Sequence, residues 1–202
     1  RSGTFFAYEG LGSIYWHMVS KLLLAVQECC FRAIDNKADK ETTEKLITHF
    51  HDIYEGLGVH KDPKIYGAFT TDAYSHTPAG GGARQPGMTG QVKEDIISRF
   101  GELGVIVKSG NIQFRPELLK DNEFVDCETV FRYLDINGSI KEIILEKESL
   151  AFTYCQIPII YRIAEETKTE VIKDNNEKIV LSKNELTSEI SQEIFKTNKE
   201  RI

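Results

Sequence analysis

Cysteine is scarce in this chain and is not arranged for metal binding. The 202 residues include only four cysteines, and neither a CxxC pair nor a cysteine–histidine pair at zinc-ligand spacing occurs. Cys29 and Cys30 are neighbours, and on a helix their side chains point about 100° apart, so they rarely bond to each other. The low cysteine density and the apolar flanks therefore predict buried free thiols in a reducing compartment.

A basic excess and a long apolar run are also missing. Lys and Arg number 25 against 31 Asp and Glu, so the formal net charge is -6, and no basic stripe suggests a nucleic-acid partner. The most apolar stretch, residues 14–34, contains four charged or titratable side chains, too many for a membrane span. The first ten residues lack the charged-then-apolar layout of a secretory signal. We therefore expect a cytoplasmic protein without a nucleic-acid or membrane partner.

Recognisable catalytic and cofactor motifs are lacking as well. The sequence contains no GxSxG elbow, no Walker motif and no Rossmann glycine pattern. Glu94 and Asp95 are adjacent on an expected helix and point apart, while His49 and His51 are two residues apart and lie on different sides. We therefore assign no catalytic residue, no metal and no cofactor.

Three helices are expected in the first half of the chain. Residues 12–34 are apolar around most of the helix circumference, so this helix must be covered on several sides. Residues 40–57 place their apolar side chains on one face, and Gly58 follows as a stop. A third helix is expected over 88–102, where apolar residues recur at spacing four. A buried helix followed by an amphipathic one is typical of the inner and outer pair of a layered helical array.

Beyond Gly104 the pattern changes to that of strands. Short alternating runs separated by turn residues recur at short intervals, which indicates an antiparallel sandwich. These runs cover 105–114, 129–136, 139–147, 150–155, 157–164, 168–173 and 178–182. The expected fold class is therefore α+β, with a helical domain over 1–104 and a β-sandwich domain over 105–202.

The Gly/Pro-rich segment over residues 67–91 is the best candidate for a ligand site. Its three consecutive glycines, 80–82, allow a ligand to approach the main chain closely. Thr89 and Gly90 fall where the third helix begins, and the free amides of a helix N-terminus suit a phosphate or a sugar hydroxyl. The alternative is an ordered loop in which Thr89 only caps its own helix.

Five further residues are candidates for the same site. His76 and Arg84 supply donors from the loop, and Tyr74 offers a surface on which a sugar ring stacks. Trp16 and His17 lie in the first expected helix, where an aromatic ring beside a polar group suits a sugar pocket. A hydrogen-bonded core histidine is the other interpretation of His17.

Three long stretches of the chain resemble one protein family. They are FFAYEGLGSIYWHMVSKLLLAVQE from residue 5, DAYSHTPAGGGARQPGMTGQVKEDIISRFGELGV from residue 72, and LAFTYCQIPIIY from residue 150. Together they are similar to the end of the helical barrel, and to the β-sandwich that follows it, in relatives of the six-hairpin glycosidases. The resemblance is closest to the cellobiose-phosphorylase-like group of large bacterial carbohydrate-active proteins.

This resemblance implies a fold and a reaction. The fold would be the last part of an (α/α)6 barrel followed by a jelly-roll-like sandwich, with the reaction at the open end of the barrel. In that group an acidic residue protonates the leaving glycosidic oxygen while inorganic phosphate attacks the anomeric carbon. Thr89 and Gly90 match the Thr-Gly that holds phosphate at the start of the last barrel helix, and His76 is a looser match. The family's general acid belongs to an earlier hairpin, so the resemblance assigns no catalytic residue here.

The resemblance therefore predicts the C-terminal segment of a glycoside phosphorylase or hydrolase that acts on oligosaccharides. Inorganic phosphate would be the co-substrate in the phosphorylase branch, but Gln85, Pro86, Gly87 and Gln91 depart from the phosphorylase pattern and keep hydrolysis open. We expect such a segment to pack on the N-terminal part of its barrel and to show little activity alone; a homo-oligomer is compatible with this. The alternative is a non-catalytic carbohydrate-binding or assembly module whose function lies on the sandwich.

Overall fold

The computed structural model describes residues 16–57 and 89–196, with side chains over 18–57 and 93–196. In this part of the chain it contains four α-helices and four two-stranded antiparallel sheets, which confirms the α+β class. The chain divides into two compact units, Arg1–Glu102 and Leu103–Ile202. The closed helical barrel and the sandwich stay predictions.

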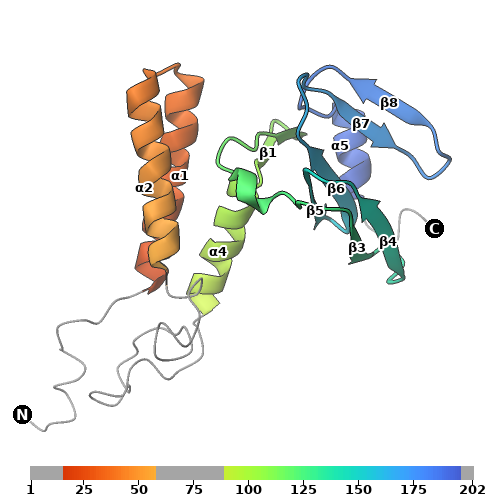
Figure 1. Cartoon of the computed structure of the whole chain (residues 1–202), viewed down its shortest axis with the longest axis horizontal. Coiled ribbons are helices and arrows are strands. Elements are labelled where there is room, and N and C mark those ends of the chain that lie inside the picture. Colours follow the sequence, from red (N-terminus) through yellow and green to blue (C-terminus); the bar gives the residue numbers. More distant parts are fainter. Residues whose placement is uncertain (1–15, 58–88, 197–202) are drawn as a thin grey trace, which may run out of the picture. The chain divides into compact units, whose positions relative to one another are not determined.

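The first unit contains the three helices that the sequence predicts. They are α1 (Trp16–Asp35), α2 (Lys40–Gly56) and α4 (Thr89–Glu102). Helix α2 begins where Asp39 caps it, because Asp39 Oδ1 accepts a hydrogen bond from the Thr42 amide at 2.8 Å. This bond and the one from the Thr42 hydroxyl lower the pKa of the Asp39 carboxyl. Helices α1 and α2 form an antiparallel hairpin, and α1 also packs against α4 (Figure 1).

Helix α1 has an apolar covered side and a mixed open side, where Lys21, Glu28 and Arg32 are exposed next to apolar residues. Leu23 and Cys30 are fully buried, as is Phe50 on α2. On the opposite side of α1 an apolar stripe is exposed, made of Met18, Leu22, Ala25 and Cys29. The expectation of buried thiols is thus right for Cys30 and wrong for Cys29, Cys127 and Cys155, which are exposed; all four are free. Burial of Cys30 raises the pKa of its thiol to about 11.

The second unit is a succession of β-hairpins followed by a helix. The hairpins are β1 (Val105–Lys108) with β2 (Asn111–Phe114), β3 (Thr129–Leu134) with β4 (Ile140–Leu145), β5 (Ser149–Tyr154) with β6 (Ile157–Arg162), and β7 (Thr169–Ile172) with β8 (Lys178–Leu181). A short 3-10 turn, η2 (Asp121–Glu123), lies between the first two hairpins, and α5 (Ser188–Phe195) follows the last. The sequence predicts every one of these strands, but neither η2 nor α5.

Local turn chemistry fixes each hairpin. The β1–β2 loop is Ser109-Gly110 and the β5–β6 loop is Cys155-Gln156, and both residues of each pair have positive φ, as a tight two-residue turn requires. The β3–β4 loop is longer, and there Asp135 Oδ1 accepts bonds from the amides of Asn137 and Ser139. These three strand pairs are therefore specified by residues that are close in sequence.

The core of the second unit joins three of the hairpins to α5. Ile112 and Phe114 of β2 are buried with Leu186 and Ile190, and side chains of β5 to β8 pack against them. Residues 184–186 pair with β2, because Leu186 N donates to Ile112 O at 2.9 Å and Phe114 N donates to Asn184 O at 2.7 Å. The β3–β4 hairpin contributes no residue to this core.

None of the helices in the described ranges has the length and apolar character needed to cross a membrane. This agrees with the polar side chains that interrupt the apolar residues of α1 in the sequence.

Candidate functional site

The structure places four of the seven predicted site residues at the start of two helices. Thr89 and Gly90 are the first two residues of α4, and Trp16 and His17 are the first two of α1. The other three predicted residues, His76, Arg84 and Tyr74, lie outside the described residues. The site therefore has to be judged from the relation between α1 and α4.

Helices α1 and α4 run parallel to each other. Ser20 Oγ of α1 donates to Asp95 Oδ1 of α4 at 3.3 Å. Further towards the C-terminus of both helices, Gln27 Nε2 of α1 donates to the Ser98 carbonyl of α4 at 2.8 Å. Residue numbers therefore increase in the same direction along both helices. Trp16 lies about 6 Å before Ser20 along its axis, and Thr89 about 9 Å before Asp95. The starts of α1 and α4 consequently lie at the same end of the helix pair (Figure 1).

The seam between these two helices is unusually polar. Gln27 of α1 is buried, as are Glu94, Ser98 and Glu102, which follow one another at spacing four on one face of α4. Arg99 Nη1 donates to Glu102 Oε2 at 2.6 Å and partly neutralises that carboxylate. Two buried atoms, Glu94 Oε2 and Ser98 Oγ, make no hydrogen bond to protein atoms. Buried polar atoms of this kind usually bond to a water or a ligand.

Glu94 is the first acidic residue of α4 after Thr89. It lies five residues after Thr89, hence about 7 to 8 Å along the α4 axis. Its side chain is 6% exposed, and the ammonium of the exposed Lys93 lies 3.9 Å from Oε1. Its Oε2 is a buried hydrogen-bond acceptor without a protein donor, and a carboxylate by itself repels phosphate. The polar contact between α1 and α4 is thus suited to accepting hydrogen bonds from a donor next to the N-terminus of α4. It is not suited to binding an anion between the two helices.

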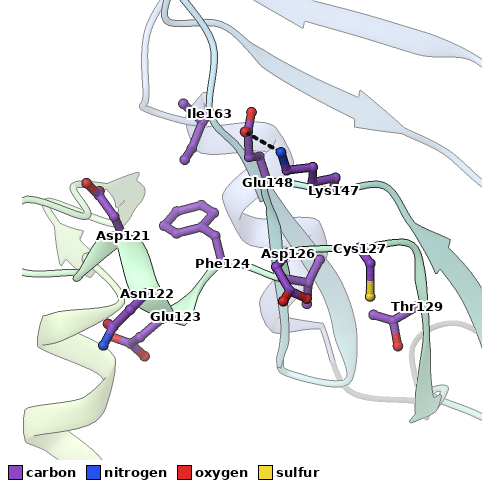
Figure 2. Close-up of a pocket in the computed structure, with 11 residues that line it drawn as sticks. Asp121, Asn122, Glu123, Phe124, Asp126, Cys127, Thr129, Lys147, Glu148 and Ile163 are labelled. Atoms are coloured by element: carbon purple, nitrogen blue, oxygen red, sulfur yellow. Dashed lines mark ion pairs between the residues drawn. The ribbon is translucent and has the colours of Figure 1, made fainter.

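The second unit carries a separate open hollow of about 800 Å³ (Figure 2). Figure 2 shows Phe124 in the middle of the lining side chains, with carboxylates around it. Four carboxylates line the hollow, against one ammonium, and that ammonium lies 3.6 Å from Glu148 Oε1. The lining residues are Asp121, Asn122, Glu123, Phe124, Val125, Asp126, Cys127, Thr129, Lys147, Glu148 and Ile163. The negative lining disfavours anionic ligands.

The thiol in this hollow is not activated as a nucleophile. Cys127 is its one thiol, and its hydrogen bond with Asp126, together with the charge of that carboxylate, raises the pKa of Cys127. The thiol is therefore protonated at neutral pH, and the protonated form is a poor nucleophile. Within residues 16–57 and 89–196, no group of three or more His, Cys, Asp or Glu side chains is placed to hold a metal ion.

Sequence reasoning did not find the hollow or the seam. The hollow has a sequence signal, the acidic stretch DNEFVDCE over 121–128, in which one aromatic residue stands among four carboxylates. The seam has none, because Gln27 and Ser98 are unremarkable helix residues until α1 and α4 are brought together.

Comparison with known proteins found no family model and no curated protein that matches this chain.

Proposed function

We propose that this chain is the C-terminal segment of a glycoside phosphorylase or hydrolase and that it contributes sugar and phosphate contacts at the end of the helix pair where α1 and α4 begin. In this proposal the amides of Thr89 and Gly90 and the Thr89 hydroxyl bind an anion or a sugar hydroxyl. Trp16 and His17 belong to the same site, as do His76, Arg84 and Tyr74 from the preceding loop. The reaction itself comes from the family resemblance.

The observation that carries the proposal is the parallel packing of α1 and α4. Residues 16 and 89 are separated by more than seventy positions in the sequence, yet the described parts of α1 and α4 that begin with them start at the same end of the pair. Two parallel helices that present their N-termini to one ligand add their partial positive charges there. This also agrees with an (α/α)6 barrel, in which neighbouring inner helices are parallel and each is joined to an antiparallel outer helix such as α2.

The open face of α1 supports the same proposal. A helix with a covered side against α2 and α4 normally shows charged residues on the other side. Here the open side carries the exposed charged residues Lys21, Glu28 and Arg32, but beside them also Met18, which is 57% exposed, and Leu22, which is 52% exposed, followed by Ala25 and Cys29. An inner helix of a larger toroid needs such a stripe, because further helices cover it.

A second candidate function is a non-catalytic carbohydrate-binding module. The observation that favours it is the hollow around Phe124, which combines an aromatic ring with carboxylates that accept hydrogen bonds from sugar hydroxyls. In this case the ligand is a neutral sugar and phosphate plays no part, because the lining is negative.

A thermal-shift titration with inorganic phosphate, sulfate and a panel of glucosides tests the proposal. At about 100 times its dissociation constant a ligand stabilises the folded state by about 2.7 kcal/mol, which raises the melting temperature by several degrees. We expect phosphate or glucosides to give such a shift in the natural sequence and in Phe124→Ala. The shift should disappear in Thr89→Val, which keeps the size of the side chain but removes its hydroxyl.

The pattern across the two variants separates the two functions. A glucoside shift that survives in Thr89→Val and is lost in Phe124→Ala would overturn the first proposal in favour of the binding module. A cooperative melt that no ligand moves would contradict both.

A further inference from the structure

The β3–β4 hairpin carries an exposed, largely apolar face. Its register sets Val130 opposite Ile144, Arg132 opposite Glu142, and Leu134 opposite Ile140, and paired residues at spacing two share one side of a hairpin. We call these six residues the outer face of the β3–β4 hairpin. All six are exposed, and the four aliphatic side chains are between 51% and 72% exposed.

The other side of the same hairpin is the covered one. There Phe131 and Tyr133 stack with their ring centroids 5.7 Å apart, Ile143 is partly buried, and Leu145 is 4% exposed. The hairpin therefore already has an inner side, so the aliphatic residues of the outer face are not needed for its attachment. A solvent-facing strand pair usually carries charged and polar side chains at these positions.

The β7–β8 hairpin distributes its exposed charges differently. Its two outward pairs are Glu170 with Val180 and Ile172 with Lys178, so each pair contains one charge. In the outer face of the β3–β4 hairpin the charges are instead gathered into one central pair, with aliphatic pairs on both sides. Arg132 Nε donates to Glu142 Oε1 at 2.8 Å in that central pair.

We propose that the outer face of the β3–β4 hairpin pairs with the same face of a second copy of this chain, across a two-fold axis that runs parallel to the strands. Such an axis sets β3 of each copy over β4 of the other. Arg132 then faces Glu142 of the second copy, Val130 faces its Ile144, and Leu134 faces its Ile140. The interface is self-complementary, as two-fold association requires.

The charge pattern selects this axis over its alternative. A two-fold axis perpendicular to the strands would set Arg132 over Arg132 and Glu142 over Glu142, and like charges in an interface are unfavourable. In the favoured arrangement the four charges alternate in sign around the axis, while the aliphatic pairs on both sides supply the apolar contact. Two sheets packed in this way lie about 10 Å apart with their strands nearly aligned.

The expected dimer is weak. A stable interface buries about 800 Å² on each partner, and one face of a two-stranded hairpin is smaller than that. The net charge of -6 on each copy also opposes association, so ionic strength should be held at about 0.15 M. The charged centre sets the orientation more than the affinity, because desolvating the four groups offsets much of their attraction.

Sedimentation velocity on the whole chain, from about 5 to about 500 µM, tests the proposal. We expect the average mass to rise with concentration from 23.0 kDa toward twice that value. Arg132→Glu alone and Glu142→Arg alone should each stay monomeric, because each homodimer would bring like charges together. An equimolar mixture of the two variants should associate again, as should the double variant R132E/E142R. In both cases residue 132 of one copy again faces an opposite charge at residue 142 of the other.

Controls separate association from folding. Glu170→Arg makes the same charge change on the β7–β8 hairpin and should associate like the natural sequence. The single variants should keep their circular dichroism spectra, because an exposed ion pair adds little to stability. A natural sequence that stays monomeric throughout the range overturns the proposal. A mixture of the two variants that remains monomeric also overturns it. Single variants that associate as the natural sequence does would overturn it too, because they would indicate edge-to-edge strand pairing, which does not depend on these charges.

Discussion

Replacement of Gly104 by alanine is expected to destabilise the second unit by about 3 to 5 kcal/mol. Gly104 has a φ of +75°, a conformation that costs an L-residue about 1 kcal/mol or more. A methyl group there would also collide with the backbone carbonyl of Arg115 and the nitrogen of Pro116. These are main-chain atoms, so neither collision is relieved by a side-chain rotation. The Arg115 amide donates to the Gly104 carbonyl at 2.7 Å, and this bond at the open end of the β1–β2 hairpin would be lost.

Gly110→Ala is the matched control for this experiment. Gly110 also has a positive φ, +84°, but a methyl group there meets nothing within 4 Å. We expect it to cost only the conformational penalty of about 1 kcal/mol. Urea unfolding followed by circular dichroism measures both. If both variants lose the same free energy of unfolding, the close contact between residue 104 and residues 115–116 is not the reason for the glycine.

Replacement of Gly101 by alanine is expected to loosen the contact between α1 and α4. Alanine normally favours a helix over glycine, but here its methyl group would collide with the amide group of Gln27. Gln27 is buried and donates to the Ser98 carbonyl, so displacing it leaves buried polar atoms unpaired at about 1 to 3 kcal/mol. With the overpacking that accompanies it, we expect a net loss of about 2 to 4 kcal/mol. Amide hydrogen exchange in α1 and α4 measures the loss.

Two further variants identify the cause. Gly56→Ala changes the last residue of α2, where a methyl group meets nothing within 4 Å, and should leave stability unchanged or slightly raised. In the background of Gln27→Ala, the additional change Gly101→Ala should cost much less than it does alone. A Gly101→Ala variant as stable as Gly56→Ala would contradict the parallel packing on which the proposed site depends.

The secondary structure was predictable because its signals are local. Three helices and every strand follow from apolar periodicity and turn residues, as in Asn137-Gly138, where Gly138 has the positive φ that this turn requires. Helix α5 was missed because it has only eight residues and few apolar positions. Its amphipathic pattern becomes apparent only once Ile190 is buried among Ile112, Phe114 and Leu186.

The arrangement of these elements was less predictable. The expectation of a sandwich assumed that consecutive strands join into large sheets. The named strands of the described residues instead form four two-stranded sheets, and beyond these β2 also pairs with residues 184–186. Hydrogen bonds between hairpins depend on long-range packing that alternation does not encode.

For the candidate site, sequence alone indicated that Thr89 opens a helix and that α1 needs cover on several sides. It did not indicate that α1 and α4 run parallel. That relation depends on Ser20, Gln27, Asp95 and Ser98, whose roles exist only in the folded chain. The same is true of the outer face of the β3–β4 hairpin, where strand register, and not composition, gathers Arg132 and Glu142 at the centre of four aliphatic side chains.

The most direct test of the proposed phosphate or sugar site is a titration of inorganic phosphate, then of a glucoside, followed by amide NMR signals. The account predicts that the amides of Gly90 and Gln91 shift most, that they saturate with one dissociation constant, and that Thr89→Val abolishes both effects. Shifts that stay linear in ligand concentration and are spread over surface amides, or saturable shifts confined to residues 121–129, would contradict it.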